Sequence, residues 1–434
     1  MRTITENTFH DSLSGAVFAI EGIKDACVVL NGPTGCKFYH AAISDSQYMR
    51  GLTFEPSKYS DSYYMGQARV PCTYLDGHDY VFGSGEKLKD ILKLLDEESY
   101  GLIAVINTPG AALIGDDLDG FLEREVTKTP CFSIENTGYS GKFSEGHQKA
   151  VLAALRNINM MPRKESEIRK KTVNFLGFSI YQKYFEQNYQ ALKSLLALCG
   201  ISVIAAPGAG DCVEMLSQMA EAELNIVVFP EYGHETAVLM ENTYGIPFIS
   251  LDEGLPIGFD GTMSFITQVC RRVGANPHSA MSKVNEARAR AYLHLARYSS
   301  LLGLPKGATF GIKAESSVCY ALTKWLCSYL GMIPAAISVL PDRDDLSMQK
   351  LTDFLRQIDC LSVMEAPFIE TPMHILFADG STIAQARLNN KKVCGVELSL
   401  PSLGYLDVTD KYILGENGAL FLLEQILNGL RFLL

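Results

Sequence analysis

The sequence lacks the features that mark a membrane or secreted protein. It has no run of about twenty apolar residues, the length that a helix needs to cross a bilayer. Residues 1–15 lack the basic start and the apolar stretch of a secretory signal. The net charge of −11 argues against a basic surface of the kind that binds nucleic acid or anionic lipid. We therefore expect a cytoplasmic protein that contacts neither membranes nor nucleic acid.

The sequence also lacks clustered cysteines. Its eleven cysteines are dispersed, and no two form a C-x-x-C pair. A zinc site or a self-contained ferredoxin-type cluster is therefore not expected, because both draw their ligands from closely spaced residues. Dispersed cysteines without an export signal indicate a reducing compartment, where most thiols are small buried side chains.

Two nucleotide-binding fingerprints are missing as well. Neither G-x-G-x-x-G nor G-x-x-x-x-G-K-[ST] occurs in the chain. Any Rossmann-like unit in this chain therefore need not bind NAD.

One kind of unit repeats along the chain instead. About ten short apolar runs rich in β-branched residues end in Gly, Pro, Ser or Asp, and amphipathic stretches such as 85–98 and 212–224 follow them. Continuous rather than alternating apolar character indicates strands buried on both faces, and hence parallel sheets. The alternation of such strands with helices predicts an α/β fold made of doubly wound units.

Ten strands are too many for one ordinary sheet, so we divide the chain into three Rossmann-like domains. The basic polar segment 159–171 is typical of a linker. A long helical pattern follows residues 275–279 and ends at the stop signals Gly303 and Pro305. The predicted domains are residues 1–165, 166–304 and 305–434.

Ligands of open parallel sheets bind at the carboxyl ends of the strands, where Gly-rich and polar loops converge. One such loop, "NGPTGC", places Cys36 beside Lys37 at the predicted start of a helix. The positive charge of Lys37 and the helix start both favour the thiolate form, which can ligate a metal or attack an electrophile. The alternative is a buried cysteine packed under a turn.

Two acidic motifs have both a chemical and a structural interpretation. Asp116, Asp117 and Asp119 are candidates for a divalent metal site, but helix capping explains them better. Glu231, His234 and Glu235 are candidates for acid–base chemistry, but they also suit the first turn of a helix. No role is assigned to the isolated histidines His78, His147 and His374.

Taken in order, several stretches resemble the nitrogenase component 1 family. These stretches extend through most of the chain and include "SGAVFAI", "GPTGC", "DYVFGSGEKL", "LIGDDLDGF", "NTGYSGKFSEGH", "ENTYGIPF", "LPIGFDGT" and "LGENGALFLLEQILNGL". The family comprises nitrogenase molybdenum–iron protein subunits, their cofactor-assembly relatives and cluster-bearing subunits of tetrapyrrole reductases. The resemblance implies three Rossmann-like domains, in agreement with the division above.

The resemblance also implies an iron–sulfur cluster held between two related subunits, each with up to three cysteine positions. Cys36 occupies the middle position, Asp11 falls near the first, and Pro109, which has no ligand atom in its side chain, falls near the third. His10 is a neighbouring alternative to Asp11. Two copies of Cys36 and Asp11 would hold one 4Fe–4S cluster in a homodimer, while a heterodimer with a cysteine-richer subunit fits equally well.

The family's second metal site is not expected here. Its cysteine would fall near Phe229, and its histidine would fall in residues 398–407, which contain none. Dinitrogen is therefore not the expected substrate. A cavity between the domains, lined by loops such as 207–211, 230–235 and 314–317, is expected to hold a small organic substrate, a tetrapyrrole or another cluster.

Three functions follow from these inferences. The first is a reductase subunit that relays electrons from a separate ATP-dependent iron protein through its interface cluster to a substrate in the cavity. The second is a scaffold or carrier that assembles a metal cofactor without turnover. The third is a non-redox binding module in which Cys36 is only structural.

Overall fold

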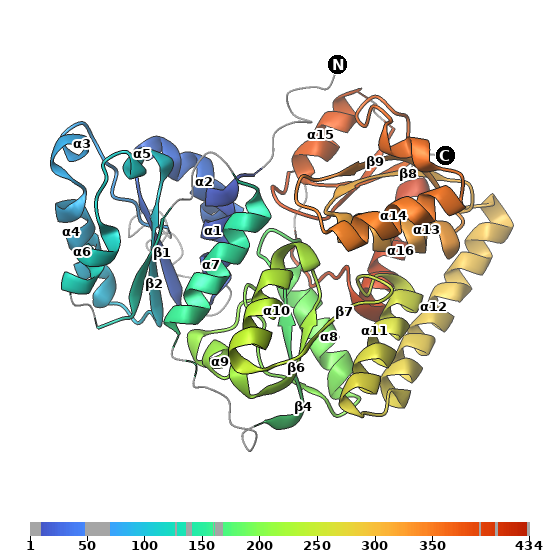
Figure 1. The fold of residues 1–434 in the computed structure, drawn as a ribbon. Helices are drawn as coiled ribbons and strands as arrows, with labels where there is room; N and C mark the ends of the chain where they lie inside the picture. Colours follow the sequence, from blue (N-terminus) through green and yellow to red (C-terminus); the bar gives the residue numbers. More distant parts are fainter. Residues whose placement is uncertain are drawn as a thin grey trace.

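The chain forms three lobes, each built on a parallel sheet with helices around it (Figure 1). This computed structural model describes residues 10–47, 70–125, 128–135, 141–158, 160, 168–389, 392–403 and 407–431. Every strand pair within the three sheets is parallel. The predicted α/β class with parallel sheets is confirmed.

The first lobe has strand order β1-β2-β3. Every residue of β1 and β2 is buried, because helices cover both faces of this sheet. Its elements are α1 (Ser12–Glu21), β1 (Ala26–Asn31), α2 (Thr34–Gln47), α3 (Asp79–Phe82), α4 (Gly85–Asp96), β2 (Leu102–Asn107), α5 (Pro109–Ala112), α6 (Leu118–Arg124), β3 (Cys131–Ile134) and α7 (Phe143–Asn157).

The second lobe has strand order β5-β4-β6-β7, and the third has β11-β10-β8-β9. The second contains β4 (Arg169–Leu176), α8 (Phe185–Ala197), β5 (Ser202–Val203), α9 (Val213–Ser217), β6 (Ala222–Val227), α10 (Pro230–Tyr244), β7 (Phe248–Ser250) and α11 (Gly258–Val273). After the long helix α12 (His278–Leu302), the third contains β8 (Thr309–Ala314), α13 (Ser316–Ser328), β9 (Ile333–Val339), α14 (Asp345–Gln357), β10 (Ile375–Ala378), α15 (Gly380–Asn389), β11 (Cys394–Glu397) and α16 (Gly415–Arg431).

The structure corrects three local predictions. Strand β9 was missed, because Pro334 and two alanines weaken its apolar β-branched pattern, and as an edge strand it tolerates the proline. The stretch 212–224 is not one helix, since α9 has only five residues and β6 begins at Ala222. The predicted linker overlaps the start of β4 at Arg169, and most of the remaining linker lies outside the described residues.

Two glycines allow α1 and α7 to touch through their backbones. A Cβ atom on Gly146 would lie 1.8 Å from the carbonyl oxygen of Ser12, and one on Gly15 would lie 2.0 Å from that of Phe143. No larger residue fits at either position without moving a helix. This close crossing fixes the amino-terminal ends of both helices, where Asp11 and Phe143 lie.

Main-chain hydrogen bonds join the lobes. Gly210 N–H donates to the Gly22 carbonyl over 3.0 Å, between the first and second lobes. Lys183 N–H donates to Leu398 and Leu400 N–H to Tyr181, each over 2.9 Å, between the second and third. The C-terminal helix α16 packs against α8, α11 and α12 as well as against its own sheet.

The three sheets fall within the three predicted ranges, but the domain boundaries after residues 165 and 304 stay a prediction. Residue 165 itself lies outside the described ranges. Within those ranges, no helix combines the length and the apolar character needed to span a bilayer.

Candidate functional site

Cys36 lies where β1 of the first sheet turns into a helix. Helix α2 begins at Thr34, three residues earlier than expected, so Cys36 is in its first turn. The Cys36 N–H donates to the Pro33 carbonyl over 3.1 Å, and its side chain is half-buried. A Cβ on Gly32 would lie 2.3 Å from Oγ1 of Thr108, so only glycine fits this turn against the start of α5.

Asp11 is tied to the same helix as Cys36. It caps α1 by accepting the Ser14 N–H over 2.9 Å, and its Oδ1 also lies 3.1 Å from Nδ1 of His40. His40 follows Cys36 by four residues, so both lie on one face of α2. Burial would raise the pKa of Asp11, but the hydrogen bonds from His40 and Ser14 outweigh it and lower the pKa to about 2.

The structure separates His10 from Asp11. The His10 ring lies 5.5 Å from the Tyr181 ring and 6.1 Å from the Phe143 ring, in the space between the lobes. Burial there is the main cause that lowers its pKa. Asp11 is therefore the neighbour that bonds to the helix carrying Cys36, while His10 faces the pocket described below.

Pro109 lies at the same edge of the sheet but offers no donor atom. It is the first residue of α5, and Thr108 caps that short helix. A Cβ on the next residue, Gly110, would lie 3.5 Å from the Pro33 ring, so α5 begins beside the turn that precedes Cys36.

Sequence reasoning missed Cys72, which also lies beside this turn. It pairs in parallel with Leu30 as an isolated bridge, and its thiol donates to the Gly32 carbonyl over 3.2 Å. Burial is the main cause that raises the pKa of Cys72, and the charge of Lys37 partly offsets it. No local pattern pointed to Cys72, because the chain separates it from Cys36 by more than thirty residues.

The donors that the structure describes at this edge suit an iron–sulfur cluster in kind but are too few to hold one. Thiols and a carboxylate are suitable iron ligands. However, no three His, Cys, Asp or Glu side chains within the described ranges converge closely enough to hold a metal ion. All eleven cysteines lie in those ranges, and none of them forms a disulfide.

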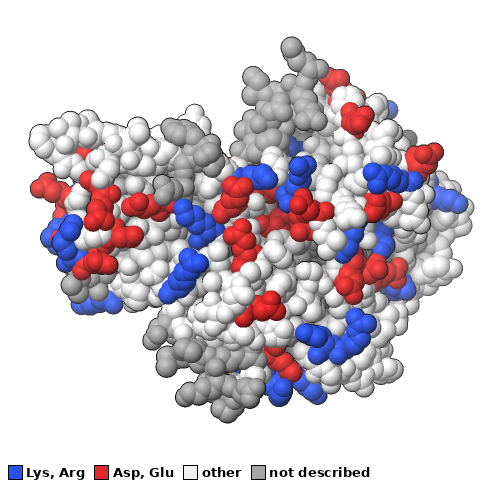
Figure 2. All heavy atoms as spheres, viewed as in Figure 1, with Lys and Arg blue, Asp and Glu red and all other residues white. Residues whose placement is uncertain are grey.

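An exposed apolar surface, the edge patch, lies on the helix that carries Cys36 and on two short helices near its first turn. It consists of Phe38 and Tyr39 on α2, Val81 and Phe82 on α3, and Leu113 after α5, with exposed fractions between 67% and 84%. These helices line one edge of the first lobe in Figure 1, and the surface over α3 and α5 in Figure 2 is almost free of charge. Exposed apolar surface of this kind marks interaction sites.

The acidic motif at 116–119 is structural, as the capping interpretation predicts. Asp117 caps α6 by accepting the Gly120 N–H over 3.0 Å. Asp116 accepts the N–H and the hydroxyl of Ser84, each over 2.7 Å, and Asp119 accepts the hydroxyl of Ser133 over 2.6 Å.

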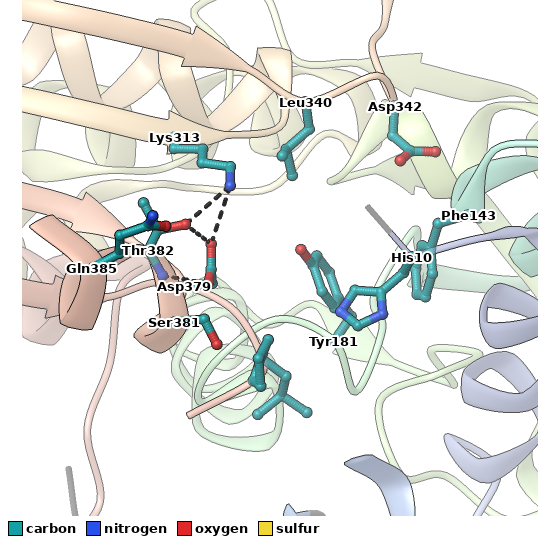
Figure 3. A pocket seen from close by; sticks show the side chains of 12 residues that line it. His10, Phe143, Tyr181, Lys313, Leu340, Asp342, Asp379, Ser381, Thr382 and Gln385 are labelled. Carbon is teal, nitrogen blue, oxygen red and sulfur yellow. Dashed lines mark hydrogen bonds and ion pairs between the residues drawn. The ribbon is translucent and has the colours of Figure 1, made fainter. Parts of the chain in front are cut away.

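A pocket of about 250 Å³ lies between the lobes, at the carboxyl ends of all four strands of the third sheet (Figure 3). This is where open parallel sheets bind ligands. The lining corrects our expectation, because loops 207–211, 230–235 and 314–317 do not contribute. It is formed by His10, Phe143, Tyr181, Lys313, Leu340, Asp342, Asp379, Ser381, Thr382, Gln385, Leu400 and Pro401.

One wall of the pocket is polar and the other is aromatic. Lys313, which is buried, donates to the hydroxyl of Thr382 over 3.0 Å and lies 3.7 Å from Oδ2 of Asp379. Tyr181 and Phe143 face this polar wall across the pocket (Figure 3). Lys313 stands at the end of β8, so the rule about carboxyl ends could have identified it from sequence.

Behind the pocket lies a buried acidic network. Glu231, in the first turn of α10 as expected, accepts hydrogen bonds from the Ser316 and Ser317 hydroxyls over 2.7 and 2.8 Å. The Tyr232 hydroxyl donates to Oε1 of Glu315 over 2.7 Å. Burial, with the nearby Glu231 charge, raises the pKa of Glu315 from 4.5 to about 7.

This network predicts that replacing Glu315 with Gln flattens the pH dependence of stability. The groups that face Glu315 are Glu231, Tyr232 and Asp342. Since its folded pKa exceeds its unfolded pKa, the folded state binds the extra proton, and stability falls as pH rises from about 4.5 to about 7. At pH 8 we expect the free energy of unfolding of Glu315→Gln to be about 3 kcal/mol higher than that of wild type. At pH 4 we expect no such difference.

Urea unfolding at several pH values measures this effect, and Glu98→Gln, at an exposed position after α4, is the control. An equal pH dependence in Glu315→Gln and wild type would show that Glu315 titrates normally.

His147 is fully buried and does not line the pocket, but its ring stacks near that of Phe143, which does. Its ring lies 5.3 Å from the Tyr232 ring, and burial lowers its pKa to about 3. Neither ring nitrogen has a hydrogen-bond partner in the described part of the chain.

The positions of the family's second metal site offer neither the cysteine nor the histidine that the family resemblance implies. Phe229 is buried against the Phe178 ring, with 5.5 Å between ring centroids. In the segment 398–407, Leu400 and Pro401 line the pocket, while 404–406 lie outside the described residues. These residues do not fit that metal group.

The chain matches known proteins along most of its length. A sequence model described as "Nitrogenase component 1 type Oxidoreductase" matches residues 12–431. A solved structure titled "Nitrogenase Cp1 at pH 6.5" superimposes with a TM-score of 0.74 and 17% identity, covering 96% of this chain and 91% of that one. At that identity the likeness concerns the fold.

Two curated relatives are similar over shorter segments. The nitrogenase molybdenum-iron protein alpha chain of Methanothermobacter marburgensis is 29% identical over 261 residues, covering 56% of this chain and 51% of that protein. A light-independent protochlorophyllide reductase subunit from Parasynechococcus marenigrum is 27% identical over 199 residues, covering 42% and 37%. The matched part of the chain thus spans about half or less of these relatives.

Proposed function

Because the chain belongs to the nitrogenase component 1 type oxidoreductase family, we propose that it is the electron-relaying subunit of a nitrogenase-like reductase. Proteins of this family bind iron–sulfur clusters and work with a partner reductase. The cluster is a 4Fe–4S centre shared between two subunits at the edge patch. Electrons come from a separate ATP-dependent iron protein and reach a substrate in the inter-domain pocket.

The position of Cys36 is the observation that carries this proposal. Its thiol lies in the first turn of α2 beside Lys37, where the N–H groups of the helix start would offset the negative charge of a bound cluster. Asp11, linked to α2 through His40, is the second donor that the family resemblance implies. A bound iron–sulfur cluster supplies one-electron transfer.

A second subunit, identical or homologous, completes the ligand set. Because the described residues of one chain gather no three-ligand group, iron would need ligands beyond those residues, which a second subunit can supply. The edge patch supports this arrangement, since large apolar side chains next to Cys36 would be buried by a facing copy. The dispersed cysteines, none of which forms a disulfide, suit a reducing, cytoplasmic location.

The pocket favours a small organic substrate. Its volume of about 250 Å³ is below the roughly 300–1,000 Å³ of typical ligand sites, which disfavours an enclosed tetrapyrrole. Lys313 and Thr382 would orient a polar group, while Phe143 and Tyr181 would cover the opposite face and exclude water. Dinitrogen is not proposed, because Phe229 stands where the metal cofactor would be anchored.

Anaerobic purification of the wild-type protein tests the proposal. We expect a dimer with about four iron and four sulfide per pair of chains, and a broad absorbance near roughly 400 nm. A monomer or dimer without iron after reconstitution with ferrous iron and sulfide would reject it.

A scaffold or carrier for cofactor assembly is the second candidate. The specific observation in its favour is the missing anchor at Phe229, since a carrier must release what it binds. A reductase oxidises its reduced partner catalytically when substrate is present, whereas a carrier passes iron to an acceptor protein. Measuring both in one anaerobic assay distinguishes them.

A further inference from the structure

We propose that Cys72 is a second cysteine ligand of the interface cluster, so that each subunit offers two sulfurs, Cys36 and Cys72. This inference rests on the proposed function, because it concerns the ligands of the same cluster. In a homodimer the two pairs would give four cysteine ligands, which is the usual set for a 4Fe–4S centre.

The two cysteines flank one short turn. Segment 70–75 runs alongside the end of β1, where Thr73 N–H donates to the Leu30 carbonyl and Leu75 N–H to the Gly32 carbonyl, each over 3.0 Å. The Cys72 thiol lies 3.2 Å from that same Gly32 oxygen. Cys36 follows Gly32 by four residues, in the first turn of α2. Residues distant in sequence therefore bring two sulfurs to the same edge of the sheet.

The charge at this turn suits two thiolates. Lys37, adjacent to Cys36, is buried and lies within electrostatic range of Cys72. Its positive charge and the N–H groups at the start of α2 would offset the negative charge of a thiolate-bound cluster. Cysteine thiolates are also the usual ligands of iron–sulfur clusters, which favours Cys72 over the carboxylate of Asp11 as a ligand.

Binding iron would break fewer stabilising interactions at Cys72 than at Asp11. Asp11 would give up its cap of Ser14 and its pairing with His40, and loss of a cap costs about 1 kcal/mol. Cys72 would give up one weak thiol hydrogen bond, and its proton would pass to solvent as the Fe–S bond forms. The Gly32 carbonyl would keep the Leu75 N–H as a donor.

Anaerobic reconstitution of matched variants tests this inference, with iron and sulfide content and the electron paramagnetic resonance spectrum as readouts. Cys72→Ser preserves the shape and the hydrogen bond to Gly32, and Cys72→Ala removes both. We expect each to lower iron per dimer at least twofold or to change the spectrum, with an unchanged melting temperature for Cys72→Ser. Cys131→Ala is the control and is expected to retain full iron, because this half-buried thiol lies at the opposite end of the first sheet.

Two results separate this inference from the proposed function. If both Cys72 variants keep full iron and the wild-type spectrum while Cys36→Ala loses them, the inference is wrong and the cluster proposal stands. If iron is lost in Asp11→Asn but kept in Cys72→Ser, then Asp11 is the second ligand. A wild-type protein without iron would reject the proposed function itself.

Discussion

Cys36→Ala is expected to leave the protein folded and to remove almost all of its iron. Alanine is the best helix former, so the first turn of α2 should persist. The half-buried thiol forms no disulfide, so its removal should have little effect on the fold. It does, however, remove one proposed iron ligand from each subunit. Removal of a residue that only hydrogen-bonds to a metal ligand lowers metal affinity about 10–100-fold. Removal of the ligand itself should therefore lower the affinity for iron at least about 100-fold.

Iron content, sulfide content and the absorbance near roughly 400 nm measure the effect, with the melting temperature recorded on the same samples. Cys131→Ala again serves as the matched control. Equal iron in Cys36→Ala and wild type would mean that this cysteine is only structural, and the interface-cluster proposal would have to be abandoned.

Lys183→Met is expected to destabilise the fold strongly. The Lys183 ammonium is 6% exposed and joins the second lobe to the third, where it lies 3.1 Å from Oε2 of Glu397 and also pairs with Asp407. Methionine would fill the space but leave Glu397 as an uncompensated buried charge. Breaking a buried pair in this way costs about 3–5 kcal/mol.

The free energy of unfolding in urea measures this loss. Lys411→Met is the matched control, because Lys411 also pairs with Asp407 but lies nearer the surface, where such a pair contributes about 1 kcal/mol or less. The double variant Lys183→Met with Glu397→Gln should recover much of the stability, since no buried charge remains unpaired. Equal effects of Lys183→Met and Lys411→Met would show that the buried pair contributes little.

The Lys183–Glu397 pair also positions the pocket. Glu397 accepts the Leu403 N–H over 2.8 Å, and the segment between them carries Leu400 and Pro401 into the pocket wall. Loss of the pair should therefore loosen that wall as well as reduce the stability of the whole chain.

The sequence by itself determined the parts of this protein that depend on near neighbours. Continuous apolar runs such as β1 and β2 required burial on both faces. Asp117 required only the N–H of Gly120, three residues later, to cap α6, and Gly303 ended α12 as expected. Family motifs pointed to the turn that carries Cys36. Strand β9 was lost because an edge strand with a proline has a weak local signal.

Only the tertiary structure decided which distant residues meet. Asp11 reaches His40, Cys72 lies beside Gly32, and the pocket combines His10, Tyr181 and Lys313 from three lobes. These contacts depend on helix crossings such as that of Gly15 with Phe143, and on hydrogen bonds between lobes, as at Lys183 and Leu398. Periodicity and capping act over a few residues, so they carry no information about such long-range packing.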